Sequence, residues 1–112
     1  MSKRMVRLTV KLTASANRVQ DLVAAFRFLT VSTRLDQGCL ACSVWSEPDS
    51  SVHYVEEWST EEDIRRRVGS ESFTSVLELL ESVGEPPHVQ VDFVSRTRGL
   101  DYVAEVRQFG AR

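Results

Sequence analysis

The chain has 112 residues, of which 42% are hydrophobic and 27% are charged, and its formal charge is −2. This length corresponds to one domain of ordinary size, and the composition is typical of globular proteins. The slightly acidic balance, with basic residues scattered along the chain, provides no positively charged surface for nucleic acid. We therefore expect a single domain over residues 1–112, with a core at about 5–95 and a C-terminal extension at 96–112, that does not bind nucleic acid.

Signals for membrane insertion or secretion are not evident in the sequence. No apolar run approaches the roughly 18 residues that a membrane-spanning helix requires. Polar and charged side chains interrupt the segment behind the N-terminal Met-Ser-Lys-Arg-Met, which therefore does not resemble a signal peptide. Two cysteines, Cys39 and Cys42, agree with a reducing compartment. We expect a cytoplasmic protein that does not bind membranes.

The first half of the chain predicts a strand, a helix and a pair of strands. Residues 5–13 alternate hydrophobic and polar side chains, which is typical of a half-buried strand. Hydrophobic residues then recur at helical spacing from about 16 to 35, and Gly38 ends this helix. Residues 39–46 and 52–58 have strand character and are joined by the turn sequence Glu-Pro-Asp-Ser-Ser.

The second half predicts helices followed by one more strand. Ser59 has the capping-box spacing, and Thr60 has it in a weaker form, so a helix is expected to begin here and to run to about Val68. A further helix is predicted over 70–83, because hydrophobic residues recur at helical spacing until a Gly-Glu-Pro-Pro sequence. Alternation over 89–93 predicts the last strand.

The predicted order β-α-β-β-α-β is that of the α+β ferredoxin-like fold, a four-stranded antiparallel sheet with its helices on one face. The C-terminal extension is less clear from its pattern. Leu100, Val103 and Val106 favour a short helix, and a strand exchanged between subunits is the alternative.

One strand face carries large aromatic side chains. Alternation places Tyr54, Glu56 and Trp58 on one face of their strand and His53 on the other. We interpret the Trp-Tyr face as the one that the helices leave uncovered, and soluble monomers avoid exposing such an apolar patch. Packing against a second copy would cover this face, so we expect a homodimer.

The central part of the chain resembles a known family. A helix end, a glycine break, a strand, an aspartate-containing turn and a strand closing with Glu-x-Trp are similar to the antibiotic biosynthesis monooxygenase (ABM) family. The matching residues are Thr33, Arg34, Gly38, Cys39, Asp49, Glu56 and Trp58. The family usually continues with His-x-x-Ser-x-x-Phe, of which this chain keeps Ser70 and Phe73 and has Arg67 in place of the histidine. The resemblance covers residues 5–95 and implies a dimeric α/β barrel with a ligand cleft between the sheet and the helices of each subunit.

The resemblance also implies a function. It indicates a small cofactor-independent monooxygenase that acts on a quinol or an aromatic polyketide-like substrate, without flavin or metal. Trp58, Tyr54 and Arg67 would then orient the aromatic ring and stabilise its anion, and Trp45 or Phe73 would wall the cleft. The pKa of arginine is too high for a general base, so no catalytic residue is assigned. The alternative is a non-catalytic dimeric domain that binds a small hydrophobic ligand in the same cleft.

Purely structural roles remain open for these side chains. Trp58 could be a core tryptophan whose indole N–H donates to a carbonyl. Arg67 could pair with Asp63 or Glu71, each four residues away on a helix. Glu56 and its neighbour in sequence point to opposite faces, so one of the two carboxylates could be buried and paired with a lysine or arginine of the first strand, Arg7 or Lys11.

The remaining candidate residues point away from metals and cofactors. His53 and His88 are the only histidines, and none occurs between them, which disfavours haem binding through a histidine on the helix after Trp58. Cys39 and Cys42 have C-x-x-C spacing, but residues i and i+3 of a strand face opposite sides, so a structural role is expected. We expect no bound cofactor and no metal site.

Overall fold

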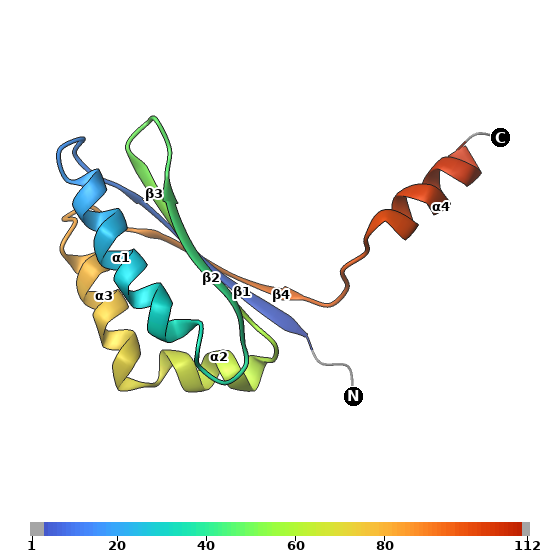
Figure 1. The fold of residues 1–112 in the computed structure, drawn as a ribbon, viewed down its shortest axis with the longest axis horizontal. Coiled ribbons are helices and arrows are strands. Elements are labelled where there is room, and N and C mark those ends of the chain that lie inside the picture. The colour runs from blue at the N-terminus through green and yellow to red at the C-terminus, as the bar shows by residue number, and fades with distance from the viewer. Residues whose placement is uncertain (1–3, 111–112) are drawn as a thin grey trace.

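The computed structural model describes residues 4–110. Its elements follow in the order β1 (Met5–Thr13), α1 (Val19–Thr33), β2 (Cys39–Ser46), β3 (Ser51–Trp58), α2 (Glu61–Val68), the 3-10 turn η1 (Glu71–Phe73), α3 (Thr74–Glu81), β4 (His88–Val94) and α4 (Leu100–Gly110) (Figure 1). The four strands form one sheet in the order β2-β3-β1-β4, and each neighbouring pair is antiparallel. Helices α1, α2 and α3 lie on one face of this sheet (Figure 1). The predicted α+β ferredoxin-like fold is confirmed.

The core lies between β1, β3 and the helices. Side chains on one face of β1 are all buried, as the alternating pattern predicts: Val6, Leu8, Val10 and Leu12. They contribute to one cluster with residues of α1 and α3, which include Phe26 and Val76. Burial of large apolar side chains, each contributing about 1.5–3 kcal/mol, is the main force that holds the helix layer on the sheet.

The prediction of which sheet face is uncovered is wrong. Tyr54 and Trp58 are 0% and 1% exposed within the single chain, and the ring of Phe26 on α1 lies 4.9 Å from the ring of Tyr54. Pairing of Tyr54 with Val10 places it in the row that faces the helices. Alternation shows which residues share a face, but it does not show which face the helices cover. The open face instead carries Trp45, whose ring stacks on His53 at 5.3 Å.

A β-bulge corrects the prediction for the two cysteines. The register between β2 and β3 shifts between Cys39 and Ala41, so β2 has one extra residue there. Cys39 pairs with Trp58 and Cys42 with Glu56, and both thiol-bearing residues therefore lie on the helix-covered face. Both are free cysteines, Cys42 buried and Cys39 half-buried.

The helix ends differ from the sequence pattern in detail. Helix α1 is shorter than the predicted range of about 16–35, the single helix predicted over 70–83 is divided into η1 and α3, and the weaker of the two predicted caps is the one used by α2. The cap of α2 is Thr60, whose Oγ1 accepts from the Asp63 N–H at 3.1 Å, and the Ser59 hydroxyl donates to the Asp63 carboxylate. The predicted break at Gly69 separates α2 from η1 and α3. The C-terminal extension is a helix, α4, rather than a strand. Over residues 4–110, none of the helices combines the length and the hydrophobicity needed to cross a membrane.

Gly38 brings the loop after α1 against the start of α2. Its φ of +87° lies in the left-handed region, which glycine occupies without strain. A Cβ atom at this position would lie 2.2 Å from Cγ of Asp63. Hydrogen bonds from Ser59, Thr60 and Arg66 hold that carboxylate, so it cannot move away easily. The same bonds, those from Ser59 and Thr60 first, lower the pKa of Asp63.

We predict that Gly38→Ala lowers the free energy of unfolding by about 2–4 kcal/mol, because backbone strain and a steric clash add together. Gly84→Ala is the matched control, since Gly84 has a φ of +84° with no atom within 4 Å of the added Cβ. It should cost only about 1 kcal/mol from backbone strain. Urea denaturation measures both changes, and equal losses would show that the contact with Asp63 does not matter.

Candidate functional site

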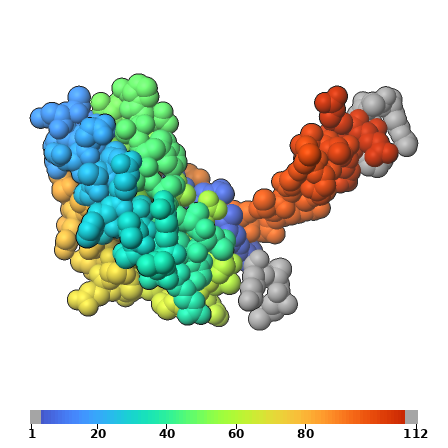
Figure 2. Space-filling model, viewed as in Figure 1, coloured from blue at the N-terminus to red at the C-terminus, as the bar shows by residue number. Residues whose placement is uncertain are grey.

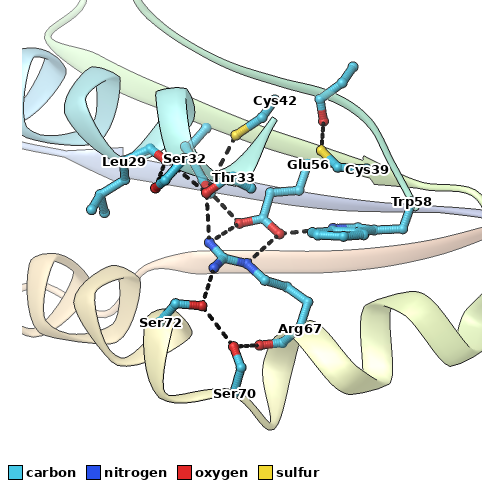
Figure 3. Close-up of polar contacts among 12 residues, drawn as sticks. Leu29, Ser32, Thr33, Cys39, Cys42, Glu56, Trp58, Arg67, Ser70 and Ser72 are labelled. Atoms are coloured by element: carbon cyan, nitrogen blue, oxygen red, sulfur yellow. Dashed lines mark hydrogen bonds and ion pairs between the residues drawn. The ribbon is translucent and has the colours of Figure 1, made fainter. Parts of the chain in front are cut away.

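The carboxylate of Glu56 is the centre of a buried polar network (Figure 3). Glu56 is 0% exposed and lies on β3 between two residues of the same face. The Tyr54 hydroxyl donates to Oε2, and the indole N–H of Trp58 donates to Oε1 at 2.9 Å. The period of two along a strand places these three side chains together. Trp58 is thus a core tryptophan, as the structural alternative had it, but its indole N–H donates to the Glu56 carboxylate rather than to a carbonyl.

Arg67 approaches the same carboxylate from α2 (Figure 3). Its Nε donates to Oε1 of Glu56 at 3.2 Å, and its Nη2 donates to Oε2 at 3.0 Å. Arg67 is 4% exposed. The guanidinium also donates to the hydroxyls of Thr33, at 3.2 Å, and Ser72, at 3.0 Å, and lies 5.2 Å from the ring centre of Phe73. The pair thus joins β3, α1, α2 and η1 at one point.

The burial of this ion pair depends on its hydrogen bonds. Removing a carboxylate and a guanidinium from water costs several kcal/mol for each ion, which the attraction offsets only when the other polar positions are also satisfied. Here the Glu56 carboxylate accepts four hydrogen bonds, one from Tyr54, one from Trp58 and two from Arg67. Loss of one partner would leave a buried charge without compensation.

The network shifts the pKa values of its members. Burial, and then the charge of Glu56, raises the pKa of Tyr54 far above its usual value. Burial opposes the charged form of Arg67, but the hydrogen bonds and charge of Glu56 outweigh it and raise the pKa of Arg67. Burial raises the pKa of the Cys42 thiol, which donates to the Tyr54 hydroxyl at 3.4 Å, to about 11. Tyr54 and Cys42 thus stay protonated at neutral pH.

The structure brings together four of the five predicted site residues. Tyr54, Trp58, Arg67 and Phe73 lie in or beside the network, whereas Trp45 is on the opposite face of the sheet, where its indole N–H donates to Glu47 at 3.2 Å. Trp45 cannot wall a cleft that contains Trp58, because Trp45 pairs with His53 in the register of β2 and β3.

The predicted charge partners are wrong for Arg67 and for Glu56. Arg67 pairs with Glu56 rather than with Asp63 of its own helix or Glu71 of η1. The carboxylate that Arg7 approaches is that of Glu57, at 3.7 Å and partly exposed. A contact between a strand and the following helix has no fixed residue spacing, and this is why the sequence pattern missed the pair.

A hollow of about 240 Å³ opens beside the network. Residues from the loop after α1, the end of β3, α2 and the segment before α3 line it: Asp36, Gln37, Trp58, Arg66, Arg67, Ser70 and Ser72. Sequence patterns did not single out Asp36, Gln37 or the two serines as site residues. Their signal was indirect, because Asp36 and Gln37 directly precede the glycine break at Gly38 and Ser70 directly follows the one at Gly69.

The histidines lie outside this hollow. His53 faces the open side of the sheet, as predicted, and its Nε2 lies 3.0 Å from the Ser51 hydroxyl. His88 is exposed at the start of β4. Within the described range, 4–110, histidine, cysteine, aspartate and glutamate side chains form no group of three or more that could hold a metal ion.

We predict that Glu56→Gln lowers the free energy of unfolding by about 3–5 kcal/mol, because it leaves the buried Arg67 without a counter-charge. Glu57→Gln is the matched control, since it makes the same chemical change one residue away in a partly exposed pair. Its effect should stay below about 1 kcal/mol. Chemical denaturation followed by circular dichroism distinguishes these results, and a small loss for Glu56→Gln would contradict the role of the pair.

Solved structures of similar fold come from several organisms. A conserved protein of Methanosarcina mazei is 20% identical with a TM-score of 0.72, and the match covers 83% of this chain and 95% of that one. A Deinococcus radiodurans protein named for antibiotic biosynthesis monooxygenases is 16% identical with a TM-score of 0.74, covering 84% and 96%. A Nitrosomonas europaea protein with the same designation is 12% identical with a TM-score of 0.72, covering 88% and 98%. These likenesses establish the fold.

Sequence comparison identifies the family. No curated protein matches the chain at a significant level. The family model described as antibiotic biosynthesis monooxygenase matches residues 5–79, which is more than half of the chain and includes both Glu56 and Arg67. The chain therefore belongs to the antibiotic biosynthesis monooxygenase (ABM) family.

Proposed function

We propose that the protein is a small cofactor-independent monooxygenase that oxidises an electron-rich aromatic, such as a quinol or an aromatic polyketide phenol. Family membership supports this class of reaction. The observation that carries the proposal is the hollow in which an indole, a guanidinium, two serine hydroxyls and a carboxylate meet. Its volume of about 240 Å³ suits part of a small planar molecule whose remainder lies in the open mouth.

Arg67 provides the group that would bind an acidic oxygen. A guanidinium has five N–H groups. Contacts among the described residues use four of them, two with Glu56 and one each with Thr33 and Ser72. The remaining N–H is on Nη1, the nitrogen that already donates to Ser72 in the wall of the hollow. A phenolate oxygen is a strong acceptor for such a charged donor, and Trp58, although only 1% exposed, forms part of the wall beside it.

Asp36 is the proton acceptor in this proposal. Its carboxylate lines the hollow and is exposed, whereas the carboxylate of Glu56 already accepts four hydrogen bonds. Arginine stays protonated and cannot take this role. Asp36 would accept the phenolic proton while Arg67 stabilises the anion that forms.

The reaction balances with oxygen as the only co-substrate. A quinol and O2 give a hydroxyquinone and water, so that one oxygen atom forms a new C–O bond and the other leaves as water. The aromatic supplies all four electrons, because the ring loses two hydrogen atoms and gains one oxygen atom. The protein binds the ring, favours its deprotonation and keeps water from it.

A non-catalytic ligand-binding role is the second candidate, and one observation favours it. Tyr54 and Trp58 direct their polar atoms at Glu56 rather than into the hollow. These donors therefore hold the wall in shape and do not reach a ligand. The same hollow would bind a small aromatic or hydrophobic molecule without any chemical step.

We also propose that the protein acts as a cytoplasmic homodimer. Dimers are typical of this family. The open sheet face supports the proposal, since Trp45 remains 42% exposed there and stacks on His53. Packing of two such faces around a two-fold axis would complete a dimeric α/β barrel and cover this patch.

Oxygen uptake by the chelator-treated protein with a series of quinols tests the enzyme proposal. We expect consumption above the spontaneous rate, with one O2 used for each hydroxyquinone formed. Asp36→Asn should lower kcat by about 10- to 100-fold, because a positioned base contributes at least this much. Asp21→Asn, which changes an exposed carboxylate of α1 outside the hollow, is the control and should keep the wild-type rate.

Tryptophan fluorescence separates the two candidate functions. The variant Trp45→Phe leaves Trp58 as the only tryptophan, so a change on ligand addition reports on the hollow. Saturable quenching without oxygen uptake would reject the monooxygenase and support the binding role. Neither quenching nor oxygen uptake across the quinol series would contradict both.

A further inference from the structure

Helix α4 has an apolar face that its own subunit does not cover. Four large hydrophobic residues among positions 100–108 are about half exposed or more: Leu100 at 81%, Tyr102 at 51%, and Val103 and Val106 at 49% each. The helix projects from the body at the end of the segment that follows β4, and the space-filling view shows it standing apart (Figures 1 and 2). An amphipathic helix of 11 residues is only marginally stable alone in water.

Local hydrogen bonds and ion pairs of side chains involve the polar side of α4, and on the apolar side the Arg98 guanidinium lies 5.3 Å from the ring centre of Tyr102. Arg98, in the preceding segment, donates to Asp101 at 2.9 Å and to Glu105 at 2.9 Å. The Gly99 N–H donates to the Asp101 carboxylate at 3.2 Å. These bonds satisfy the first turn and the acidic side of the helix. They leave the apolar side available for a partner.

The body of the molecule carries a matching apolar surface along β4, which we call the β4 row and define as Val89, Val91 and Phe93. These three side chains face the helix layer, because they pair with the buried Val10, Leu8 and Val6 of β1. They nevertheless remain 48%, 44% and 48% exposed. The helices that bury the rest of this sheet face do not extend over its edge strand.

The rim beside the β4 row is acidic. Where α3 leads into β4, a hollow of about 460 Å³ is lined by apolar and acidic residues: Leu77, Leu80, Glu81, Gly84, Glu85, Pro86 and Pro87. Leu77 is itself 45% exposed. The surface around the β4 row thus combines apolar area with the carboxylates of Glu81 and Glu85.

We propose that α4 of one subunit packs on the β4 row of a second copy of this chain, and that the second copy reciprocates. The dimensions agree: a helix of 11 residues is about 16 Å long, and a strand of 7 residues is about 23 Å long. The charges agree as well, because Arg107 in the last turn of α4 complements the acidic rim formed by Glu81 and Glu85. Exchange of identical segments around a two-fold axis satisfies both apolar surfaces at once.

The occupant is a second copy rather than the same subunit. The chain continues from β4 into α4 without turning back, so α4 points away from its own β4 row (Figure 1). Arg98 bonds to Asp101 and Glu105 and so joins the segment before the helix to α4 itself rather than to the body. The proposal goes beyond the proposed function, since none of the residues of the β4 row lines the Trp58 hollow.

Two variants with the same charge change test the contact in the full-length protein. Val103→Glu places a charge on the apolar face of α4, and Gln108→Glu places one on the polar face as the control. We expect Val103→Glu to raise the dimer dissociation constant at least about tenfold in sedimentation experiments, and the control to change it less than about twofold. Equal effects of the two variants, or a wild-type protein that sediments as a monomer, would overturn the proposal.

A disulfide experiment shows which subunit α4 contacts. Chains carrying Val103→Cys are mixed with chains carrying Val91→Cys, both in a Cys39→Ser background, and oxidised. We expect a covalent dimer on a non-reducing gel, and much less of it when Gln108→Cys replaces Val103→Cys. If the mixture gives no covalent dimer, the exchange is rejected. It is also rejected if one chain carrying both substitutions forms the bond only within itself.

Discussion

The ion pair between Glu56 and Arg67 is the interaction on which the rest of the structure depends. It connects a strand in the middle of the sheet to the helix that closes one end of the core. A charged pair at 0% and 3% side-chain exposure is stable only if its geometry and its other hydrogen bonds are nearly complete. Tyr54, Trp58, Thr33 and Ser72 complete them. The orientation of Trp58 is therefore a consequence of the pair, and so is one wall of the hollow.

This arrangement separates rigid parts of the site from adaptable ones. Trp58 and Arg67 are held from several directions, so a ligand would meet preformed surfaces with little loss of conformational entropy. Asp36 and Gln37 lie in the loop after α1, where exposed side chains are freer to adjust. A rigid binding wall combined with an exposed loop carboxylate suits the two steps of the proposed reaction, removal of a phenolic proton and binding of the anion that forms.

The strands and helices could be predicted from the sequence because they depend on patterns among neighbouring residues. Alternation in β1 and the break at Gly69 are properties of neighbouring residues, and the structure confirms both. How the elements pack and pair with one another could not be predicted in this way. Alternation grouped Tyr54 with Trp58 correctly, yet the side on which α1 packs decides that this face is buried. Likewise, the bulge that places Cys39 and Cys42 on one face depends on pairing with β3, which their C-x-x-C spacing does not encode.

The sequence likewise predicted some features of the candidate site and missed others. Trp58 and Arg67 were recognised through their place in the family pattern, but the partner of Arg67 was not, because Glu56 is 11 residues away on another element. The contact with Glu56 gives a physical reason for an arginine at position 67, where the family pattern has a histidine. Arginine binds a carboxylate with two parallel hydrogen bonds, which a single imidazole cannot do. We infer that position 67 serves first to neutralise Glu56 and secondly to present one N–H to the hollow.

A double-mutant cycle between Glu56 and Arg67 tests this account most directly. The free energies of unfolding are measured for the wild type, Glu56→Gln, Arg67→Met and the double variant. The account predicts a coupling energy of about 2–3 kcal/mol, with the double variant more stable than the sum of the single losses implies, because the second change removes the unpaired charge left by the first. Single losses that add to within about 0.5 kcal/mol would show that the two residues do not act as a unit, and would contradict the account.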